Sequence, residues 1–259
     1  MKAIPTFLLA ACLMGSQAKA QQEANPMLSN AKTFIDVPYV ANTLETDGEE
    51  SLVINCDEVD CTTFVEYVLA MSLSSVSGNK MNESDFAANL QRIRYRGGII
   101  DGYTSRLHYI SDWINNGIRG GFMEDVTAAN SPYTRELSLS YMSSHPERYK
   151  HLCNSPENVA KMAAYEKALS GQEIHWLPKD KLPVNGLPWI KNGDIIVLTT
   201  DIPGLDAAHI GIAIYVEGTL CLLHASSSRE KVLVDKLALS RLLDRNKKWT
   251  GIRVIRMKK

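Results

Sequence analysis

The spacing of apolar positions predicts helices in the first two thirds of the chain and strands in the last third. The clearest helical repeat follows Cys61, with apolar side chains at positions 64, 65, 68, 69 and 73. Further helical patterns cover 84–94 and 156–169, separated by clusters of Pro, Ser and Asn that are typical of loops. The segment 80–185 has the weakest periodicity overall, so short helices and loops are expected there.

From Trp189 onward the pattern changes to that of β-strands. Residues 209–215 alternate in the manner of a sheet strand, and a short turn containing Gly218 returns the chain into 220–224. These two runs predict a β-hairpin. The other C-terminal elements that the pattern predicts are strands at 195–198, 231–234 and 251–257 and a short helix at 237–243. A helix packed on such an antiparallel sheet is an α+β fold.

The first twenty residues have the pattern of a secretory signal peptide. Lys2 precedes an apolar run, and an Ala-Lys-Ala sequence ending at Ala20 matches the small-residue cleavage site. We therefore expect export, to the periplasm, and a single mature domain at 21–259. A lipoprotein cleavage box ending at Cys12 is the alternative, although it leaves a very short apolar segment. Export permits disulfides; Cys61 is expected to stay free, and the other mature thiols are left unassigned.

Composition and charge exclude several classes of partner and cofactor. The 259 residues carry a formal net charge of -1, and loss of the signal segment removes Lys2 and Lys19 and makes it -3. Nucleic-acid binding requires a strongly basic face and is not expected. No interior apolar run reaches the length of a membrane span, and no Gly-rich phosphate loop indicates a nucleotide cofactor. The oligomeric state is left open.

Three residues at the ends of these predicted elements suggest a hydrolytic site. Cys61 lies at the polar start of its helix, where the helix dipole lowers the pKa of a thiol and favours the thiolate. His209 opens the first strand of the hairpin and His224 closes the second, so the turn can bring the two imidazoles together. A thiolate, a base and a group that orients the base make up a cysteine hydrolase.

Each of these residues also has a simpler interpretation. Cys61 could be an inert buried thiol, although the polar sequence that begins at Asp60 is an unlikely place for burial. Either histidine alone is more often structural than catalytic. A zinc site from Cys56, Cys61, His209 and His224 is disfavoured, because these residues lack the close pairwise spacing of structural zinc ligands.

Short motifs occur along the chain in a recognisable order. They are Pro38-Tyr39-Val40, Asp60-Cys61-Thr62-Thr63-Phe64-Val65, Asn192-Gly193-Asp194, His209-Ile210-Gly211-Ile212 and Leu223-His224-Ala225-Ser226. The set resembles the NlpC-type papain-like cysteine hydrolases of bacterial peptidoglycan. The resemblance implies a papain-like α+β fold in which Cys61 is the nucleophile, His209 the base and His224 its orienting partner.

The same resemblance implies a substrate side for the site. Tyr39 and Thr62 would line the pocket, and Asp60 would flank the nucleophile. The backbone N–H of Cys61 would contribute to an oxyanion hole at the helix start. The chain departs from the family pattern where Thr62-Thr63 replaces Ser-Gly and where the acidic loop before Cys61 is long.

A segment at about 75–185 has no counterpart in the minimal family domain, and we expect a largely helical insertion there. Its residues Arg106, His108, Tyr109 and Trp113 resemble the N-acetylmuramoyl-L-alanine amidase-like branch. Aromatic and basic side chains suit a sugar pocket, which predicts that these four bind substrate. A helix with a buried Trp and Tyr is the competing interpretation.

The resemblance implies an exported enzyme that cuts the amide between N-acetylmuramic acid and L-alanine in peptidoglycan or muropeptides. It implies no metal and no organic cofactor. Cleavage of the γ-D-glutamyl bond to diaminopimelate in stem peptides is one alternative. A catalytically silent wall-binding module and an acyltransferase on the same scaffold are the others.

Overall fold

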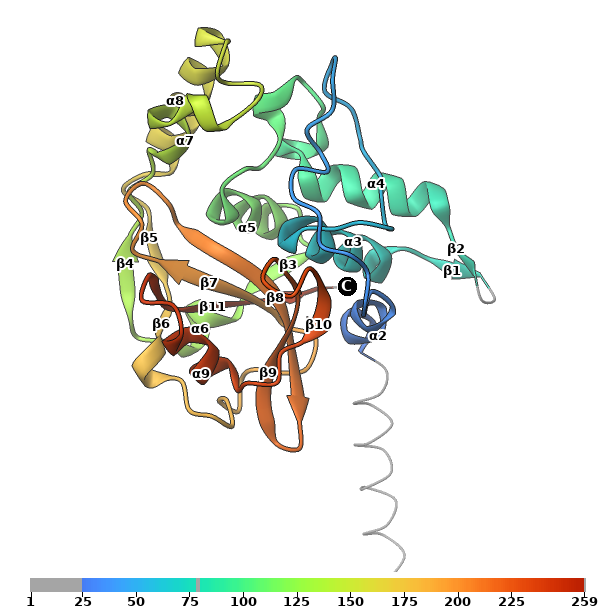
Figure 1. Cartoon of the computed structure of the whole chain (residues 1–259), viewed down its shortest axis with the longest axis vertical. Coiled ribbons are helices and arrows are strands. Elements are labelled where there is room, and N and C mark those ends of the chain that lie inside the picture. The colour runs from blue at the N-terminus through green and yellow to red at the C-terminus, as the bar shows by residue number, and fades with distance from the viewer. Residues whose placement is uncertain (1–24, 78–79, 259) are drawn as a thin grey trace, which may run out of the picture.

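The computed structural model describes residues 25–77 and 80–258 (Figure 1). The predicted signal peptide and the alternative lipid-attachment residue Cys12 lie outside the described residues. The described chain is a mixed α+β fold in which helices cover an antiparallel sheet. Within this part of the chain, no helix has both the length and the apolar composition needed to cross a bilayer.

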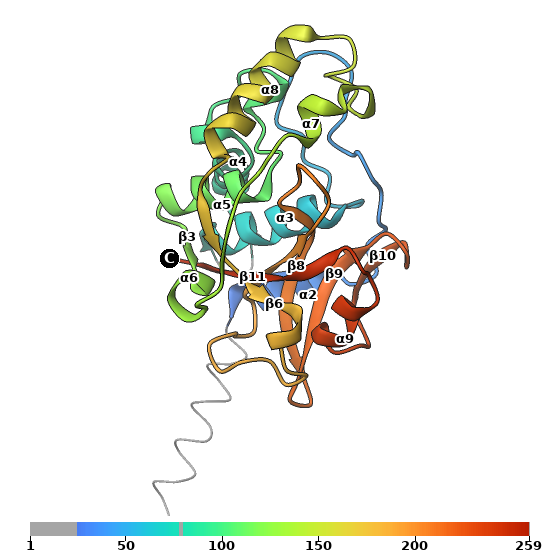
Figure 2. The same cartoon turned by 90° about the vertical axis from the view of Figure 1, so that its left-hand side faces the viewer.

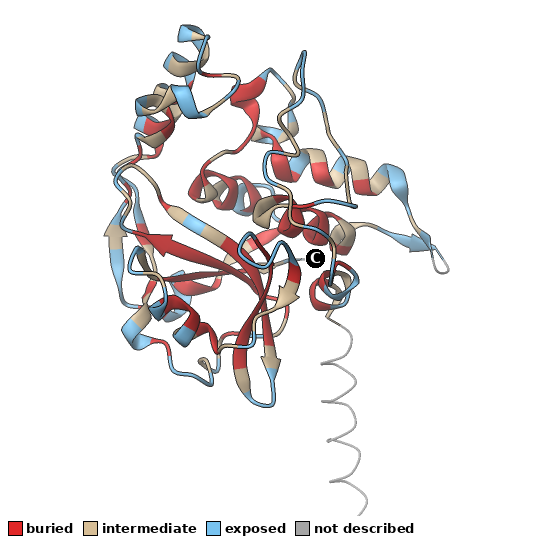
Figure 3. Cartoon of the chain, in the orientation of Figure 1, coloured by how far each residue is buried: buried red, intermediate tan, exposed pale blue. Residues whose placement is uncertain are grey.

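Seven strands of the described residues form one antiparallel sheet in the order β10-β9-β8-β7-β11-β3, with β6 also paired to β11. They are β3 (Met123–Asp125), β6 (Leu177–Pro178), β7 (Ile195–Thr200), β8 (Ala207–Val216), β9 (Thr219–Ser226), β10 (Lys231–Val234) and β11 (Trp249–Met257). β7 is buried along its whole length, so both faces of the sheet are covered there. Figure 3 shows the same concentration of buried residues in the central strands and in α3.

The helices are α2 (Pro26–Thr33), α3 (Cys61–Leu73), α4 (Glu83–Arg94), α5 (Ile110–Arg119), α6 (Val126–Asn130), α7 (Tyr141–Ser144), α8 (Pro156–Leu169) and α9 (Leu239–Asp244). Short 3-10 helices cover Arg96–Gly98, Tyr103–Ser105, Pro146–Arg148 and Lys179–Lys181. α3, α4 and α5 lie on one side of the sheet and α9 lies on the other (Figure 2).

The two faces of the sheet bury separate apolar clusters. On one face, Phe64 and Val68 of α3 pack with Ile210 and Ile212 of β8. On the other face, Leu239 of α9 belongs to a cluster with strand residues such as Leu198 and Leu222. Alternation of side chains along β8 and β9 therefore fixes which residues face α3.

The segment expected as a helical insertion is only partly separate from the sheet. The predicted helices at 84–94 and 156–169 are confirmed as α4 and α8. However, β3 and β6 from this segment pair with β11 and extend the main sheet. Two smaller antiparallel pairs also form within it, β1 (Val76–Ser77) with β2 (Lys80–Met81) and β4 (Thr134–Glu136) with β5 (Glu173–His175).

Candidate active site

Cys61 is the first residue of α3, and Asp60 fixes the start of that helix. The Oδ1 atom of Asp60 accepts the backbone N–H groups of Thr62 at 2.9 Å and Thr63 at 2.8 Å. In return, the Thr63 hydroxyl accepts the backbone N–H of Asp60 at 2.8 Å, which completes a capping box. These bonds join Asp60, the residue before Cys61, to Thr62 and Thr63, the residues after it. They therefore fix Cys61 in the first turn of the helix.

The thiol lies against the start of strand β8. Its Sγ atom is within hydrogen-bonding range of the backbone N–H of Ile210, the residue that follows His209. The Thr62 hydroxyl lies 4.0 Å from the same sulfur. Helix α3 and strand β8 therefore bring the Cys61 thiol to the backbone of β8, one residue after the first predicted histidine.

Burial sets the protonation state of this thiol. Desolvation, and then the charge of Asp60, raises the pKa of Cys61 to about 12. The sequence predicted the opposite direction from the helix dipole, and that prediction is wrong. The dipole favours an anion by only about 1 kcal/mol, which is less than removal of a thiolate from water costs. Cys61 is therefore a neutral thiol at neutral pH.

The hairpin of β8 and β9 joins the two histidines, as predicted. The Nε2 atom of His209 lies 2.7 Å from the Nδ1 atom of His224, and the two rings are nearly perpendicular, at 88°. Gly211 makes room for this pair, because an added Cβ atom there would lie 2.9 Å from the Cβ of His224. The close pairing of the imidazoles is thus built into the strands.

Both imidazoles are neutral at neutral pH. Burial, and then the proximity of His224, lowers the pKa of His209 to about 3. Burial also lowers the pKa of His224, against the opposing effect of Asp235. The indole of Trp249 stacks on His209 with ring centroids 6.2 Å apart and an interplanar angle of 16°.

The predicted residues Tyr39, Asp60 and Thr62 lie around the thiol. A backbone bridge joins Tyr39 to Val59, directly before Asp60. Burial raises the pKa of Tyr39, and the neighbouring Cys61 and Asp60 raise it further. The half-buried phenol is therefore close enough to both groups to sense their charge, and it borders the thiol.

Arg106 does not lie in an open pocket. Its guanidinium forms buried ion pairs with Glu45 at 2.7 Å and with Glu50 at 2.7 Å. It also donates to the carbonyl oxygen of Leu44 at 3.3 Å. These bonds attach the acidic loop before Cys61 to the body of the protein.

The aromatic residues of the predicted sugar pocket also pack or form hydrogen bonds inside the protein. Trp113 is 1% exposed and belongs to the main core. The Tyr109 hydroxyl is buried and donates to Glu166 at 2.6 Å. His108 is half-buried, its Nε2 atom lies 3.1 Å from the carbonyl oxygen of Tyr103, and burial lowers its pKa to about 3.

The predicted sugar pocket of Arg106, His108, Tyr109 and Trp113 is not supported. A sugar stacks on the exposed face of an aromatic ring, and the rings of Tyr109 and Trp113 are covered by protein. The competing interpretation, a helix with a buried Trp and Tyr, fits the structure.

Two residues near the histidines were not anticipated from the sequence. Trp249 comes from the start of β11, and Asp235 follows β10 with its Oδ2 atom 3.8 Å from Nε2 of His224. Neither belongs to a motif. Their proximity arises from the antiparallel pairing of β10 with β9 and of β11 with β7, which local spacing along the chain does not reveal.

The described cysteines Cys56, Cys61, Cys153 and Cys221 are free thiols. Among the residues that the structure describes, no group of three or more His, Cys, Asp or Glu side chains is arranged to hold a metal ion. The zinc alternative that combined Cys56 with Cys61 and the two histidines therefore receives no support from the geometry.

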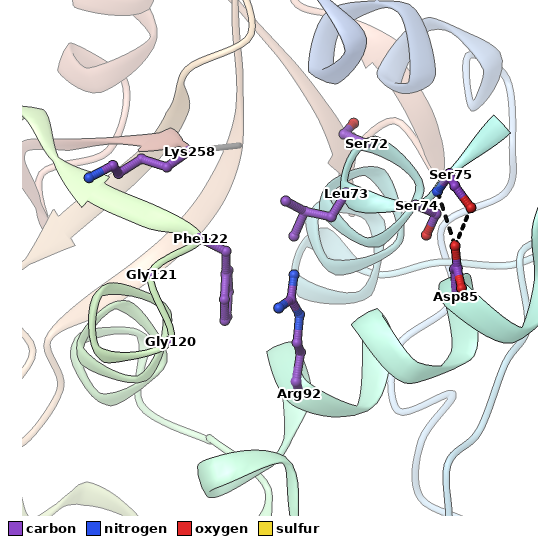
Figure 4. A pocket seen from close by; sticks show the side chains of 10 residues that line it. All are labelled: Ser72, Leu73, Ser74, Ser75, Asp85, Arg92, Gly120, Gly121, Phe122 and Lys258. Carbon is purple, nitrogen blue, oxygen red and sulfur yellow. Dashed lines mark hydrogen bonds between the residues drawn. The ribbon is translucent and has the colours of Figure 1, made fainter.

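A separate hollow of about 500 Å³ lies at the opposite end of α3 (Figure 4). It is lined by Ser72, Leu73, Ser74, Ser75, Asp85, Arg92, Gly120, Gly121, Phe122 and Lys258. Since the helix rises about 1.5 Å per residue, its two ends are about 18 Å apart. This hollow is therefore distinct from the surroundings of Cys61.

Comparison with known proteins identifies the family. The profile of the N-acetylmuramoyl-L-alanine amidase-like family matches residues 29–252. The chain is 66% identical to a crystal structure of an N-acetylmuramoyl-L-alanine amidase from Bacteroides uniformis, with a TM-score of 0.89 and coverage of 90% of this chain and 99% of that one. No curated protein matches the chain.

Two further solved structures are similar. A Bacteroides fragilis protein, provisionally named a xylanase, is 69% identical, with a TM-score of 0.87 and coverage of 89% of this chain and 100% of that one. A Legionella pneumophila protein shares 18% identity with a TM-score of 0.68, over 96% of this chain and 97% of that one, and so shows likeness of fold alone. On the extent of the profile match and these identities, the chain belongs to the N-acetylmuramoyl-L-alanine amidase-like family.

Proposed function

We propose that the protein is an exported cysteine hydrolase that cuts the amide between N-acetylmuramic acid and L-alanine in peptidoglycan or its fragments. Membership of the amidase-like family and the 66% identity to a structure named as such an amidase support the bond. The observation that carries the chemistry is the His209–His224 pair at 2.7 Å, together with a thiol at a helix start that reaches the backbone N–H of Ile210, the residue after His209. These two observations support a papain-like arrangement as part of the proposal.

In the proposed mechanism, His209 acts on the thiol through Nδ1. Its Nε2 atom is engaged with His224, so Nδ1 is the ring nitrogen left for Cys61. Because both groups rest in the neutral state, the thiol proton moves to His209 as the sulfur attacks the amide carbonyl carbon. His209 then passes this proton to the amine of L-alanine, which leaves as the carbon–nitrogen bond breaks. Water hydrolyses the muramoyl thioester and regenerates the thiol.

The negative charge that develops on the carbonyl oxygen requires a donor. The N–H groups of Thr62 and Thr63 are taken by Asp60, and that of Phe64 donates to the Asp60 carbonyl oxygen. In the described part of the chain, the Cys61 N–H donates to no oxygen and faces its own sulfur. We assign it to the oxyanion hole, as the free donor at the positive end of the helix.

On the substrate side, the proposed contacts are Tyr39, Asp60 and Thr62. Oδ1 of Asp60 is committed to the helix cap, which leaves Oδ2 for substrate. The phenol of Tyr39 and the hydroxyl of Thr62 supply further hydrogen-bonding groups within the surroundings of the thiol. The sequence predicted these three residues together with the four insertion residues, and only these three are kept as proposed substrate contacts.

The test is mass spectrometry of defined muropeptides incubated with wild type, Cys61→Ala and Cys153→Ala. Cys153 is an exposed thiol outside the site and serves as the matched control. The proposal predicts a free sugar chain and an intact L-alanyl peptide from wild type and the control, and no product from Cys61→Ala. An L-Ala-γ-D-Glu product would reassign the cut to the endopeptidase bond. Binding without turnover would indicate a wall-binding module, and product only with an added acceptor would indicate an acyltransferase.

Export is proposed from the sequence of the first twenty residues. Sequencing the N-terminus of the protein recovered from its own cells checks it, and the expected mature chain begins at Gln21. A chain that begins at a lipid-modified Cys12 would support the lipoprotein alternative instead. A chain that retains Met1 would contradict export.

A further inference from the structure

A carboxylate, that of Asp235, lies near the second ring nitrogen of His224, the one that does not face His209. The Nε2 atom of His224 is buried, and among the described residues it has no hydrogen-bond partner at normal distance. The Oδ2 atom of Asp235 lies 3.8 Å from it, within ion-pair range, and the two side chains are 20% and 6% exposed for Asp235 and His224. The chain of polar groups thus runs from Asp235 through His224 to His209.

Backbone contacts hold Asp235 in this orientation. Its N–H donates to the carbonyl oxygen of Leu222 at 2.8 Å, which attaches it to the strand that carries His224. Its Oδ1 atom accepts the N–H of Leu237 at 2.8 Å. With one oxygen bound to the backbone, the other is turned toward the imidazole.

The positions of the shared protons follow from this arrangement. A neutral imidazole carries one N–H, and a carboxylate favours that N–H on the nitrogen facing it. For His224 this is Nε2, so its Nδ1 becomes an acceptor. The 2.7 Å contact then requires that Nε2 of His209 donates, since a hydrogen bond needs one donor and one acceptor. The remaining nitrogen of His209, Nδ1, is left with its lone pair.

We propose that Asp235 is a positioning residue that fixes the tautomers of both histidines and so keeps His209 ready to accept the Cys61 proton. This inference rests on the proposed role of Cys61 as nucleophile. When His209 becomes an imidazolium, its Nε2 proton stays directed at His224, and the carboxylate stabilises the positive charge through the intervening ring. With the tautomers reversed, Nδ1 of His209 would carry a proton toward the thiol and could not act as a base.

The substitution Asp235→Asn separates this role from a structural one. The amide oxygen of Asn still accepts the Leu237 N–H, and its NH₂ group then faces Nε2 of His224 as a donor. That donor favours the reversed tautomers. We expect kcat to fall about 10- to 100-fold with KM unchanged, the size that loss of the outer hydrogen-bonding partner of an imidazole has in metal sites. Asp244→Asn, the same charge change at an exposed site on the following helix, is the control.

Two measurements without substrate complete the test. The first is the alkylation rate of Cys61 by iodoacetamide at neutral pH, resolved by peptide mass spectrometry, which should fall at least 10-fold in Asp235→Asn. The second is nitrogen-15 NMR of the imidazoles. It should find the proton on Nε2 of both His209 and His224 in wild type, and on Nδ1 of both in Asp235→Asn.

The outcomes distinguish this inference from the proposed function. Equal kcat, equal alkylation rates or identical tautomers in wild type and Asp235→Asn would overturn the role of Asp235, even if muropeptides are cleaved as proposed. Conversely, if wild type leaves muropeptides intact while the alkylation rates and tautomers differ as expected, Asp235 keeps its role and the proposed substrate fails. Asp235→Ala, which also loses the Leu237 contact, should lower stability more than Asp235→Asn does.

Discussion

The region around Arg106 and the hairpin with His209 and His224 contain similar side chains but use them differently. Arg106 and Tyr109 direct their polar atoms at Glu45, Glu50 and Glu166, which lie inside the fold. The two hairpin histidines bond to one another and retain ring nitrogens directed beyond the pair. The difference shows that residue type alone does not identify a site. A site is indicated instead by a polar atom that has no internal hydrogen-bond partner and lies close to other groups able to take part in the reaction.

The largest expected effect is a difference in kcat between variants of two half-buried histidines, His209 and His108. We expect His209→Asn to lower kcat by about 10³-fold, because it removes the proposed base. His108→Asn should leave kcat within about threefold, since His108 bonds to a backbone carbonyl within its own region. Steady-state assays on muropeptides check both, and equal losses of activity would contradict the separation.

Removal of the Arg106 charge should affect stability rather than catalysis. Arg106→Met leaves the largely buried carboxylates of Glu45 and Glu50 without their guanidinium partner, which should lower the free energy of unfolding by about 3 to 5 kcal/mol. Arg148→Met removes an exposed pair with Glu147 and should change it by less than about 1 kcal/mol. Urea unfolding measures both. A loss of kcat in fully folded Arg106→Met would return this residue to the active site.

Gly211 links the strand backbone to the histidine pair. Its replacement by Ala places a Cβ atom 2.9 Å from both the Cβ of His224 and the carbonyl oxygen of Leu223, so the hairpin must shift. We expect kcat to fall about tenfold, from loss of alignment between the two rings. A crystal structure of the variant would reveal the displacement, and normal activity with an unmoved His224 would show that the hairpin can absorb the methyl group.

The neutral resting state of the site predicts its dependence on pH. With the pKa of His209 at about 3 and that of Cys61 at about 12, kcat/KM should stay level through the neutral range. An imidazole and a thiol with the ordinary values of 6.5 and 9.0 would instead make the rate fall on both sides of neutrality. A bell-shaped profile confined to this narrower range would mean that a thiolate–imidazolium pair already exists in the free enzyme.

The most gradual expected effect, spread over several pH units, is the contribution of His108 and His209 to acid stability. The pKa of both His108 and His209 is lowered from 6.5 to about 3 by burial, so the unfolded chain binds more protons between these values. Stability should therefore decrease as the pH falls from about 6.5 toward about 3. The slope is at most about 1.4 kcal/mol per pH unit for each histidine. Unfolding free energies of wild type and His108→Asn across this range should differ in slope.

Much of the fold and the central part of the site followed from local patterns. Periodicity located α8 and the hairpin, and the motif around Cys61 placed the thiol at a helix start. Strands β3 and β6 escaped prediction because three residues and two residues are too few to establish a period. They form because β11 offers a partner edge, which is a property of the assembled sheet.

The errors in the site have equally specific causes. The aromatic and basic residues of the insertion have the composition of a pocket, and only their burial reveals that Trp113 and Tyr109 belong to the interior. The pKa of Cys61 was predicted from the helix dipole alone, which lowers it. Removal of the thiol from water raises the pKa and is the larger effect. The sequence did not predict the proximity of Asp235 to His224, because the pairing of strands brings the two residues together.

The cap that Asp60 places on α3 also bears on the survival of the thiol. Oxidation of cysteine begins with the thiolate, and with a pKa of about 12 roughly one molecule in 10⁵ carries that form at neutral pH. A protein exported as proposed would meet an oxidising environment with its nucleophile in the least oxidisable state. Burial, and to a lesser degree the same carboxylate that defines where the helix begins, would thus keep the sulfur reduced. We therefore expect hydrogen peroxide to oxidise Cys61 faster in Asp60→Asn than in wild type.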